Sequence, residues 1–525
     1  MRHPLTWNTM RIALALLLLA FTAHAADPYF NIRDYGAKPD ASAPATDAFR
    51  AAIQAAKAAG GGTVYVPAGK YVTGPIELVS NLVLDIDAGA VLTFPATRDG
   101  LTYTKGRIEG TDAITPVPLI GGHDLDNVTI RGRGLITTDN AEWLRLIRQP
   151  DGAAARTVWT QILQALDLKR PVPAADFEKA APALRPSFIR TMNSKNVHIE
   201  GIHIRGSSMW TIHILYSEHV IIRGVTIETY PGANTDGMDI DSSRDVLISD
   251  CYLDTGDDAI CLKSGKNADG LRVNRPTENV AITNCTVHHG HGAVVLGSET
   301  SGGIRNVVAS NIVALGTEKG VRIKSTRGRG NVIENIRFDH WTMEDVPEAI
   351  NVTNYYTKTP EEPVSERTPI FRNIAISNMT ITRSNVAINV EGLPEMPVAG
   401  LQISNIIASA KTGMKAYNTS RLELRNVQVN PENGPAFLIR DSKDLLLDDI
   451  SSVHPPADAP VVRLDRCPGA IVRGARAFEG TGTFLSAGPN ELKTLLLDGN
   501  FLNQAKQPSI ETSTDFWKPA ARRNQ

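Results

Sequence analysis

The sequence has few cysteines and no excess charge of either sign, and both features exclude classes of protein. Its 525 residues include only four cysteines, Cys251, Cys261, Cys285 and Cys467. Their spacing fits neither a zinc site nor a dense disulfide framework. Lys and Arg number 54 against 56 Asp and Glu, which gives a net charge of -2. Without a broad basic field, nucleic acid is not an expected partner.

Long apolar runs are absent after the N-terminus. A basic start leads into "IALALLLLAFTA", and "AHA" at Ala23–Ala25 fits a cleavage site between small residues. The run is too short to cross a bilayer comfortably, so we expect no membrane anchor. We predict a signal peptide over residues 1–25 and a mature chain, residues 26–525, that works in the periplasm or outside the cell.

The "NG" and "DG" turns that typically join hairpin strands are also scarce between consecutive strands. From about Asn81, units such as "NVTIRGRGLI", "HVIIRGVTIETY" and "NIAISNMTITRS" recur, mostly every twenty to thirty-odd residues. Within each unit apolar and polar residues alternate, as in strands with one buried face. The pattern disfavours an up-and-down barrel or a sandwich. It predicts an all-β, right-handed parallel β-helix, a single solenoid domain with one rung for each repeat.

Two of the cysteines, Cys251 and Cys285, fall at equivalent positions of two repeats. We expect them to be small buried core residues rather than a metal pair. A disulfide between them is an open alternative.

The segment "ATDAFRAAIQAAKAAGGG" departs from the repeat pattern and predicts a helix. Thr46 can serve as its N-cap, Phe49, Ile53 and Ala56 share one face, and Gly60–Gly62 ends it. Because solenoids need their ends covered, we expect this helix to close the N-terminal end of the core.

A second departure, at about residues 141–182, predicts a helical insertion. Its apolar residues suggest a packed lid rather than a loose linker. These anchors are Trp143, Leu144, Leu146, Trp159, Ile162 and Leu163.

Acidic residues gather in the rungs that follow the insertion. Aligning "NTDGMDI" on "TGDDAIC" pairs Asp236 with Asp257, and a shift of 34 residues carries Asp257 onto His291. We therefore predict a column of these three residues on successive rungs, ~4.8 Å apart, with Asp258 beside Asp257. Stacked like charges repel one another, and such strain is typical of a functional site. Asp239 is expected to be a turn-stabilising or hydrogen-bonded neighbour.

The same expectation applies to Asp241. In the next rung we align "VRIKS" on "AVVLG" at Ala293–Gly297, which places two cations directly after the acidic column. Arg322 and Lys324 are two residues apart, so they point to the same side of their strand.

The motifs "NTDG", "GDD", "GHG" and "RIK" resemble, in type and order, the four signature motifs of glycoside hydrolase family 28, the polygalacturonases. The N-terminal "NIRDYGAKPDA" and "GGGTVYVPAGKY" are similar to the opening shared by this family and some pectate lyases. The resemblance implies hydrolysis of α-1,4-linked galacturonic acid in pectin with inversion of configuration, without a metal or other cofactor. We expect a monomer.

The resemblance also implies roles for individual residues. Asp257 would be the general acid, Asp236 and Asp258 would activate water on the opposite face, and His291 would tune the proton of Asp257. Inverting enzymes use two such carboxyl groups, and neighbouring carboxylates help to keep one of them protonated.

By the same resemblance, Arg322 and Lys324 would bind a substrate carboxylate. In "INVTNYY", Tyr355 falls where the family has a tyrosine that contacts substrate. Lys263 could add a further cation or could have only a surface role.

Several alternatives stay open at this point. The chain could act on rhamnogalacturonan or xylogalacturonan within the same family. It could be a Ca²⁺-dependent pectate lyase of the same fold, or a non-catalytic adhesin or carbohydrate-binding β-helix. A lid on the N-terminal side of the site predicts exo action, whereas an insertion packed on a distant face would leave an endo-acting groove.

Overall fold

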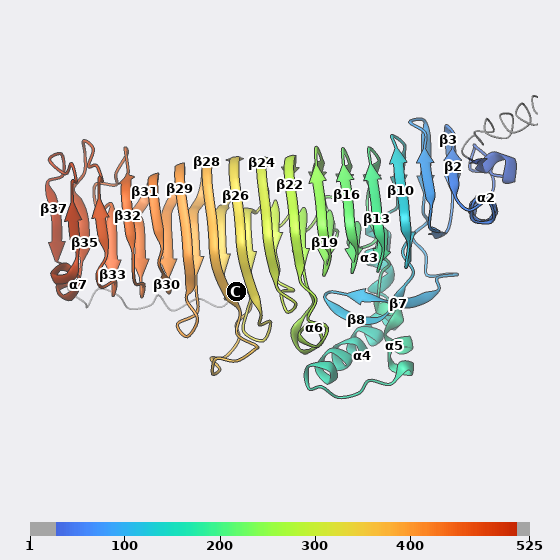
Figure 1. Ribbon diagram of the computed structural model, residues 1–525, viewed down its shortest axis with the longest axis horizontal. Helices are drawn as coiled ribbons and strands as arrows, with labels where there is room; N and C mark the ends of the chain where they lie inside the picture. Colours follow the sequence, from blue (N-terminus) through green and yellow to red (C-terminus); the bar gives the residue numbers. More distant parts are fainter. Residues whose placement is uncertain (1–27, 512–525) are drawn as a thin grey trace, which may run out of the picture.

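The chain forms one elongated solenoid whose strands lie across its long axis (Figure 1). The structure, a computed structural model, describes residues 28–511, so the predicted signal peptide lies outside the described residues. Thirty-five strands join in one hydrogen-bonded system, and its pairings are parallel. The predicted right-handed parallel β-helix is confirmed, and the barrel and sandwich alternatives are wrong.

The strands form three stacks that run along the solenoid. The first consists of β1 (Tyr29–Asn31), β2 (Gly62–Val66), β5 (Leu82–Ile86), β10 (Asp126–Gly132), β13 (Lys195–Glu200), β16 (Glu218–Arg223), β19 (Arg244–Ser249), β22 (Thr277–His288), β24 (Ile304–Leu315), β26 (Val332–Glu344), β28 (Ile370–Glu391), β29 (Val398–Tyr417), β31 (Glu423–Arg440), β32 (Leu446–Ser451), β34 (Ile471–Arg473) and β36 (Leu496–Asp498). The second begins with β3 (Gly69–Val72), β6 (Ala90–Thr93), β11 (Leu135–Thr137), β14 (His203–Arg205), β17 (Thr226–Glu228) and β20 (Tyr252–Asp254). It continues in the C-terminal halves of the long strands from β22 onward.

The third stack contains β4 (Ile76–Glu77), β9 (Ile120–His123), β12 (Ile189–Met192), β15 (Ile212–Leu215), β18 (Met238–Asp241), β21 (Ile260–Lys263), β23 (Val294–Leu296), β25 (Lys319–Lys324) and β27 (Glu348–Thr353). It runs on through the ends of β28, β29 and β31 to β33 (Val462–Asp465), β35 (Thr483–Ala487) and β37 (Gln507–Glu511), and β30 (Thr419–Ser420) adds a short pairing to β29. Three of the sequence motifs lie in the loops directly before β18, β21 and β23 of this stack, and the fourth lies on β25.

Asparagine recurs in the sequence because it occupies one turn of successive rungs. Asn279, Asn306 and Asn335 all have φ near +57°, a left-handed conformation that asparagine tolerates better than most residues. Their side-chain amides form a ladder: Asn306 Nδ2 donates to Asn279 Oδ1 at 3.0 Å, and Asn335 donates to Asn306 at 3.1 Å. One residue type thus satisfies both the backbone and its neighbour in the next rung.

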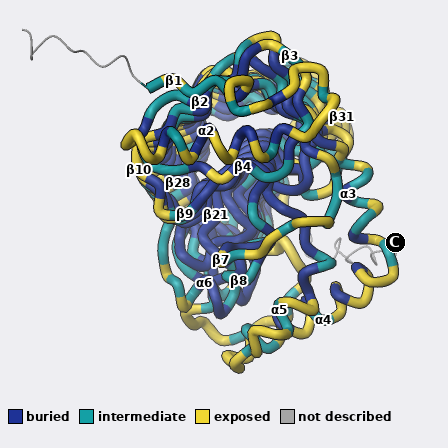
Figure 2. The backbone as a smooth tube through the Cα atoms, turned by 90° about the vertical axis from the view of Figure 1, so that its right-hand side faces the viewer, coloured by how far each residue is buried: buried dark blue, intermediate teal, exposed yellow. Residues whose placement is uncertain are grey.

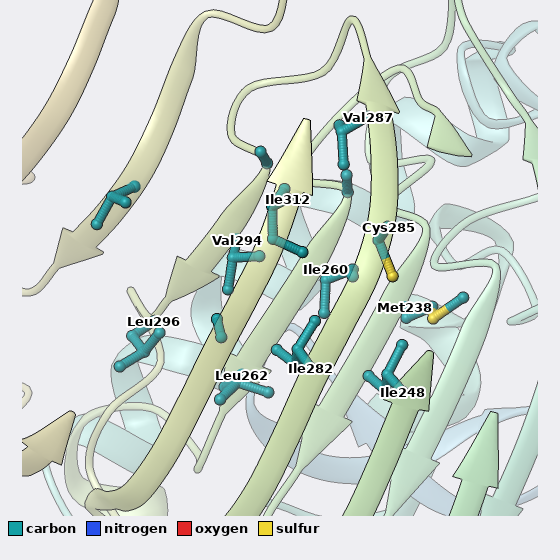
Figure 3. Packing of buried hydrophobic residues seen from close by; sticks show 14 of the residues in the cluster. Met238, Ile248, Ile260, Leu262, Ile282, Cys285, Val287, Val294, Leu296 and Ile312 are labelled. Carbon is teal, nitrogen blue, oxygen red and sulfur yellow. The ribbon is translucent and has the colours of Figure 1, made fainter. Parts of the chain in front are cut away.

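Alternating side chains point into a core that is continuous between rungs (Figure 3). Ile260 and Val294 are register partners on β21 and β23, and both are fully buried. Cys285 lies in the same core (Figure 3), and Cys251 occupies the equivalent level one rung earlier. All four cysteines are buried and carry free thiols, which confirms the prediction of core residues and leaves no disulfide within residues 28–511.

The predicted N-terminal cap is present as α2 (Thr46–Ala58), which follows the short helix η1 (Ile32–Tyr35). Phe49, Ile53 and Ala56 are buried, and Figure 2 shows α2 lying across the N-terminal end of the solenoid. The expected capping role of Thr46 is wrong: the N-cap is Ala45, and Thr46 Oγ1 accepts a hydrogen bond from the Gly74 amide at 2.8 Å.

The insertion folds as α3 (Asn140–Ile147), α4 (Pro150–Asp167), α5 (Ala174–Ala180) and η2 (Ala181–Ala183), which confirms its helical character. It projects from one side of the solenoid together with an antiparallel hairpin, β7 (Tyr103–Ile108) and β8 (Thr111–Pro116), that the repeat pattern did not predict (Figure 1). The helix α6 (Asn267–Val273) lies on the same side, and α7 (Pro489–Thr494) lies near the C-terminal end.

The insertion and the hairpin share a hydrophobic cluster separate from the main core. We call it the lid cluster; its buried members are Ile108, Trp159, Ile162, Ala180, Leu184, Met209 and Trp210. Trp143 instead packs into the main core. The insertion is therefore fixed to the solenoid at two places, as a packed lid requires. Across the described part of the chain, no helix has both the length and the apolar character needed to span a membrane.

Candidate active site

The motifs lie on four consecutive rungs of the third stack, but their register differs from the predicted one. Met238 pairs with Ile260, so the same offset places Asp236 level with Asp258 rather than with Asp257. Ile260 pairs with Val294, an offset that does place Asp257 level with His291. The predicted single column of Asp236, Asp257 and His291 is therefore wrong by one residue, and the acids occupy two neighbouring columns.

The alignment of the cationic strand is also wrong by one residue. Val321, the first residue of "VRI", pairs with Val294. Arg322 therefore pairs with Val295 rather than with the predicted Val294. The prediction that Arg322 and Lys324 point to the same side is confirmed, since both contact the carboxylate of Asp258.

Asp258 is the centre of a buried ion-pair network. Lys324 Nζ lies 2.6 Å from Asp258 Oδ2, and Arg322 Nη1 lies 3.2 Å from Asp258 Oδ1. Burial favours the neutral carboxyl, but the charges of Lys324 and Arg322 outweigh it and hold the pKa of Asp258 below its usual range. This carboxylate is therefore ionised.

Asp236 lies in a different electrostatic environment. Burial first, and then the negative charges of Asp239 and Asp257, raise the pKa of Asp236 well above its ordinary value. Burial does the same to Asp239, although Lys263 opposes it. Neither carboxyl oxygen of Asp239 has a hydrogen-bond partner among the described residues. Asp239 is therefore buried beside the catalytic candidates with no hydrogen bond to its side chain from the described residues, which differs from the supporting neighbour that the sequence predicted. Asp258, one rung on, is charged.

Lys263 is buried between these carboxyls, with 5% of its side chain exposed, so the surface role considered for it is wrong. Its Nζ lies 3.8 Å from Asp236 Oδ2, 3.5 Å from Asp239 Oδ1 and 3.2 Å from Glu299 Oε2. The indole of Trp210 faces the same ammonium group at 4.5 Å. One cation cannot neutralise both Asp236 and Asp239, and this shortage adds to burial in favouring a proton on the pair.

Asp257 and His291 are the accessible members of the group. His291 Nδ1 lies 3.0 Å from Asp257 Oδ1, and the side chains are 46% and 18% exposed. Asp257 Oδ1 also accepts from the backbone amide of Asp258 at 2.8 Å. No hydrogen bond or ion pair of the described residues involves Asp257 Oδ2, which leaves this oxygen available to a ligand.

The imidazole of His291 is held toward its charged form. Its hydrogen bond to Asp257 raises the pKa of His291 above the ordinary value against the opposing effect of burial, and the charges of Asp257 and Glu318 add to the rise. Glu318 Oε1 lies 3.7 Å from the other ring nitrogen. The histidine therefore lies between two carboxyl groups and binds a proton readily.

The tyrosine beside the two cations is Tyr356 rather than the predicted Tyr355. The Tyr356 ring lies 5.0 Å from Lys324 Nζ and 5.7 Å from the Arg322 guanidinium carbon. Tyr355 faces Arg327 instead, at 5.5 Å. Adjacent residues of this loop point to different partners, which the loose alignment of "NYY" could not distinguish.

The hairpin β7–β8 is attached to β18, the strand that follows Asp236, through a buried ion pair. Arg107 Nη1 donates to Asp241 Oδ1 at 2.7 Å, and both side chains are fully buried. At the hairpin turn, the amide of Lys266 donates to the Gly110 carbonyl at 2.9 Å. Asp241 is thus a hydrogen-bonded neighbour of the site, as expected, and it positions the hairpin.

The insertion contacts the same region. Arg185, directly after its last helix, donates to Asn234 Oδ1 at 3.1 Å and to the Ala233 carbonyl at 3.0 Å. At the end of α4, Asp167 accepts from Asn267 of α6 at 2.9 Å. The insertion therefore lies beside the rung that carries Asp236, and the end of α4 reaches the helix that follows β21, one rung further toward the C-terminus.

Asp236, Asp258 and Cys261 present ligand atoms within 4.8 Å of one another, a spacing that a metal ion could bridge. Two cations, Lys324 and Lys263, already lie against these carboxyls. Side chains of the protein itself thus supply the positive charge that a bound ion would bring.

A β-helix wall with a buried pair of carboxyls, an accessible carboxyl beside a histidine, and two cations defines a class of protein. It is an enzyme equipped for acid–base cleavage of a polysaccharide chain, since glycoside hydrolysis requires a proton donor and a carboxylate that activates water.

Comparison with known proteins identifies the family. The profile of Glycosyl hydrolases family 28 matches residues 177–428, and that of Rhamnogalacturonase A/epimerase, pectate lyase-like, matches residues 29–137. A "Probable polygalacturonase" of Vitis vinifera is 31% identical over 407 residues, which cover 75% of this chain and 76% of the relative. An "Exo-poly-alpha-D-galacturonosidase" of Dickeya chrysanthemi is 28% identical, over 71% of this chain and 65% of the relative.

Among solved structures, an exopolygalacturonase from Thermotoga maritima superimposes with a TM-score of 0.72 at 33% identity, covering 77% of this chain and 92% of that one. The chain belongs to glycosyl hydrolase family 28, and it is a glycoside hydrolase.

Proposed function

We propose that this enzyme hydrolyses α-1,4-galacturonosyl linkages of pectin from a chain end, with inversion of configuration, and that it is exported by the signal peptide predicted over residues 1–25. The observation that carries the proposal is the contrast between the accessible Asp257 and the buried carboxyls Asp236 and Asp258. The names of the similar proteins from Vitis vinifera, Dickeya chrysanthemi and Thermotoga maritima support a galacturonan substrate.

Asp257 is the proposed general acid. Its Oδ1 is occupied by His291 and by the amide of Asp258, so its Oδ2 is the oxygen that would donate a proton to the glycosidic oxygen. His291 would govern the protonation of this carboxyl through the 3.0 Å contact and would not itself attack the sugar.

Asp258 and Asp236 would hold and activate the water on the opposite face of the sugar. Asp258 is kept ionised by Lys324 and Arg322. Lys263 balances one charge of the Asp236–Asp239 pair, so a proton on Asp239 leaves Asp236 free to accept one from water. This division gives an acid on one side and a base on the other, as inversion needs.

Arg322 would bind the carboxylate of the galacturonate next to the scissile bond. Only its Nη1 contacts Asp258, and its buried Nε has no hydrogen-bond partner in the described structure. A guanidinium with free donors suits a planar carboxylate. Lys324 adds charge, and Tyr356 lies beside both cations, where a sugar ring could rest on it.

Two features support attack from a chain end. The insertion and the hairpin are anchored to the rung that carries Asp236, and Arg185 reaches this rung from its N-terminal side, where a long polymer would otherwise continue. Two of the similar proteins also carry exo-acting names. The lid would admit a chain terminus and stop an internal segment.

The direct test follows the products from polygalacturonate and from short oligogalacturonides. We expect saturated mono- or disaccharide from the first turnovers, unaffected by chelator, with little loss of viscosity, and a newly formed reducing end of inverted configuration by NMR. Unsaturated uronide that disappears with chelator would indicate a lyase, and a steep viscosity drop at low conversion would indicate mid-chain cleavage. Products formed only from rhamnogalacturonan or xylogalacturonan would show that the enzyme acts on one of these other substrates of the family.

A further inference from the structure

The lid encloses a cavity that the chemistry above does not use. Its volume is about 170 Å³, and it lies between the insertion, the turn of the hairpin and the loop that carries Asn234. Its apolar wall includes Trp159, Leu184 and Met209, members of the lid cluster. A cavity with an indole in its wall and polar groups at its rim has the character of a sugar-binding site.

The charged groups around this cavity are mostly positive. Arg148, Arg156 and Arg185 line it, and Glu109 is the acidic residue among the lining side chains. Arg185 is buried and committed to the backbone carbonyls of Ser208 and Ala233. The other two arginines come from α4 and from the end of α3.

Neither Arg148 nor Arg156 forms an ion pair with a carboxylate of the described residues. Arg156 Nη2 donates a long hydrogen bond, 3.5 Å, to the Ile147 carbonyl. The pattern differs on the exposed face of α3, where Arg145 pairs with Glu142 at 2.5 Å. Both side chains are exposed, so the two cavity arginines present guanidinium groups without a carboxylate partner to a shared space.

The cavity and the catalytic carboxyls are linked through two neighbouring rungs. Asn234, in the wall, precedes Asp236 by two residues, and Met209 precedes Trp210, whose ring lies 4.5 Å from Lys263 Nζ. Arg322 belongs to a rung on the opposite, C-terminal side of the carboxyls. Groups that bind anions thus flank the carboxyls on both sides.

We propose that this cavity, which we call the arginine cavity, binds the terminal uronate of the substrate through its carboxylate, with Arg148 and Arg156 as the ligands. The inference rests on the proposed function, because it assigns the site of the chain end that the lid admits. A guanidinium pair binds a planar carboxylate through charge-assisted hydrogen bonds, and Trp159 offers a flat apolar surface to the sugar ring. Recognition of the end by its charge also fixes how far the chain enters.

Binding can be measured without turnover. In an Asp257→Asn background, titration calorimetry with digalacturonate should give a Kd that rises about 10- to 100-fold in Arg148→Ala/Arg156→Ala. The matched control, Arg145→Ala, removes an arginine from α3 that does not line the cavity and should leave the Kd within about twofold. Arg148→Lys/Arg156→Lys should recover part of the loss, because it keeps the charge and loses the planar fork. Circular dichroism and thermal melting check that the folds match.

Esterification of the ligand provides a second test of the inference. The dimethyl ester of digalacturonate should bind the parent and the double alanine variant equally weakly, since it has no carboxylate for the arginines. An unchanged Kd for digalacturonate in the double variant would overturn the inference, as would equal losses for the acid and the ester.

A failure of this inference can be distinguished from a failure of the proposed function. Arginine-dependent binding of digalacturonate combined with mid-chain cleavage would refute exo action and keep the uronate site. Chain-end hydrolysis with an unchanged Kd in the double variant would do the reverse.

Discussion

Lys324 Nζ lies 2.6 Å from Asp258 Oδ2, and the two side chains are only 6% and 2% exposed. The sequence motif suggested a lysine that reaches for the substrate, yet in the free enzyme its ammonium group is bound to a catalytic candidate. Its first effect is therefore on the charge of Asp258, and Arg322, which is more exposed, is the better placed of the two to meet a ligand.

Replacing Lys324 by Met should shift the acid side of the kcat profile. Lys324 helps to depress the pKa of Asp258, so its loss raises that pKa and the carboxylate is lost at higher pH. We expect the acid limb to move up by about one to three pH units. Lys319→Met, on the same strand but paired with Glu348 at 3.7 Å, is the control and should not move it. An unshifted limb in Lys324→Met would show that the lysine does not control Asp258.

Arg322→Ala should impair recognition of the substrate carboxylate. The expected loss in kcat/KM on demethylated oligogalacturonide is about 10- to 100-fold, and it should be much smaller on the methyl-esterified oligomer. Arg327→Ala serves as the control, since Arg327 is a nearby arginine already paired with Glu395 at 2.6 Å. Equal losses on both substrates would make Arg322 a structural residue only.

Asp257→Asn keeps the shape of the side chain but cannot donate a proton. We expect kcat to fall by ~10²–10⁴ with an unchanged circular dichroism spectrum. An aryl galacturonide with a good leaving group, which needs little protonation, should lose far less. The control is Asp254→Asn, whose carboxylate pairs with His289 at 2.8 Å on the second stack. Near-full activity of Asp257→Asn on pectate would refute the role of general acid.

The alkaline limb of the pH profile of kcat should follow the deprotonation of His291. Its pKa is raised, so the imidazolium persists above the ordinary value and is lost as the pH rises through the shifted one. Glu318→Gln removes a negative charge 3.7 Å from the ring, and the limb should move to lower pH with little change in maximal kcat. Glu348→Gln, a like change one rung away, is the control. NMR titration of the His291 ring gives the same pKa without turnover, and an unchanged value in Glu318→Gln contradicts the assignment.

The buried pair of Arg107 and Asp241 should matter for stability rather than for chemistry. Asp241→Asn leaves the guanidinium without its closest charge partner, which typically costs about 3–5 kcal/mol for a buried pair. Burial opposes ionisation, but Arg107 and His213 hold the pKa of Asp241 at about 2. The stabilisation is complete above the unfolded pKa of about 3.9 and is lost as the pH falls toward 2.

Denaturation midpoints from pH 7 down to pH 3 check this sign. The difference in denaturation midpoint between wild type and Asp241→Asn should be constant from pH 7 to about 5 and should then become smaller. A gap that widens toward acid pH contradicts the assigned linkage. Asp245→Asn, at a half-buried acid close by on β19, provides the comparison and should cost less than about 1 kcal/mol.

Much of the solenoid was predictable because its signals are local and repeated. The left-handed turn at Asn279 and its equivalents favours Asn and Asp, and alternation along each strand reports burial directly. The four motifs identified the carboxyls, the histidine and the cations for the same reason, since each lies within a few residues on one strand end.

The remaining features depend on contacts between distant parts of the chain. Arg107 and Asp241 are 134 residues apart, and nothing near either one signals a partner. The hairpin β7–β8 was missed because its turn, Glu109–Gly110, interrupts a segment without the repeat pattern. The one-residue error that paired Asp236 with Asp257 has another cause: Asp257 and Asp258 are adjacent and either can be aligned with Asp236, and only the strand register shows that Asp258 is level with it.

The lid cluster shares no apolar core with the solenoid except through the neighbourhood of Met209 and Trp210. Trp143 holds α3 in the core of the solenoid, so the part of the lid that rests on the lid cluster alone is a small attachment made of α4, α5 and the hairpin β7–β8. Such an attachment can open locally at a lower free energy than the solenoid that bears it. Heat or denaturant would then abolish selection of the chain end before it abolishes cleavage, so that a partly unfolded enzyme would still cut pectin but without regard to where the chain begins.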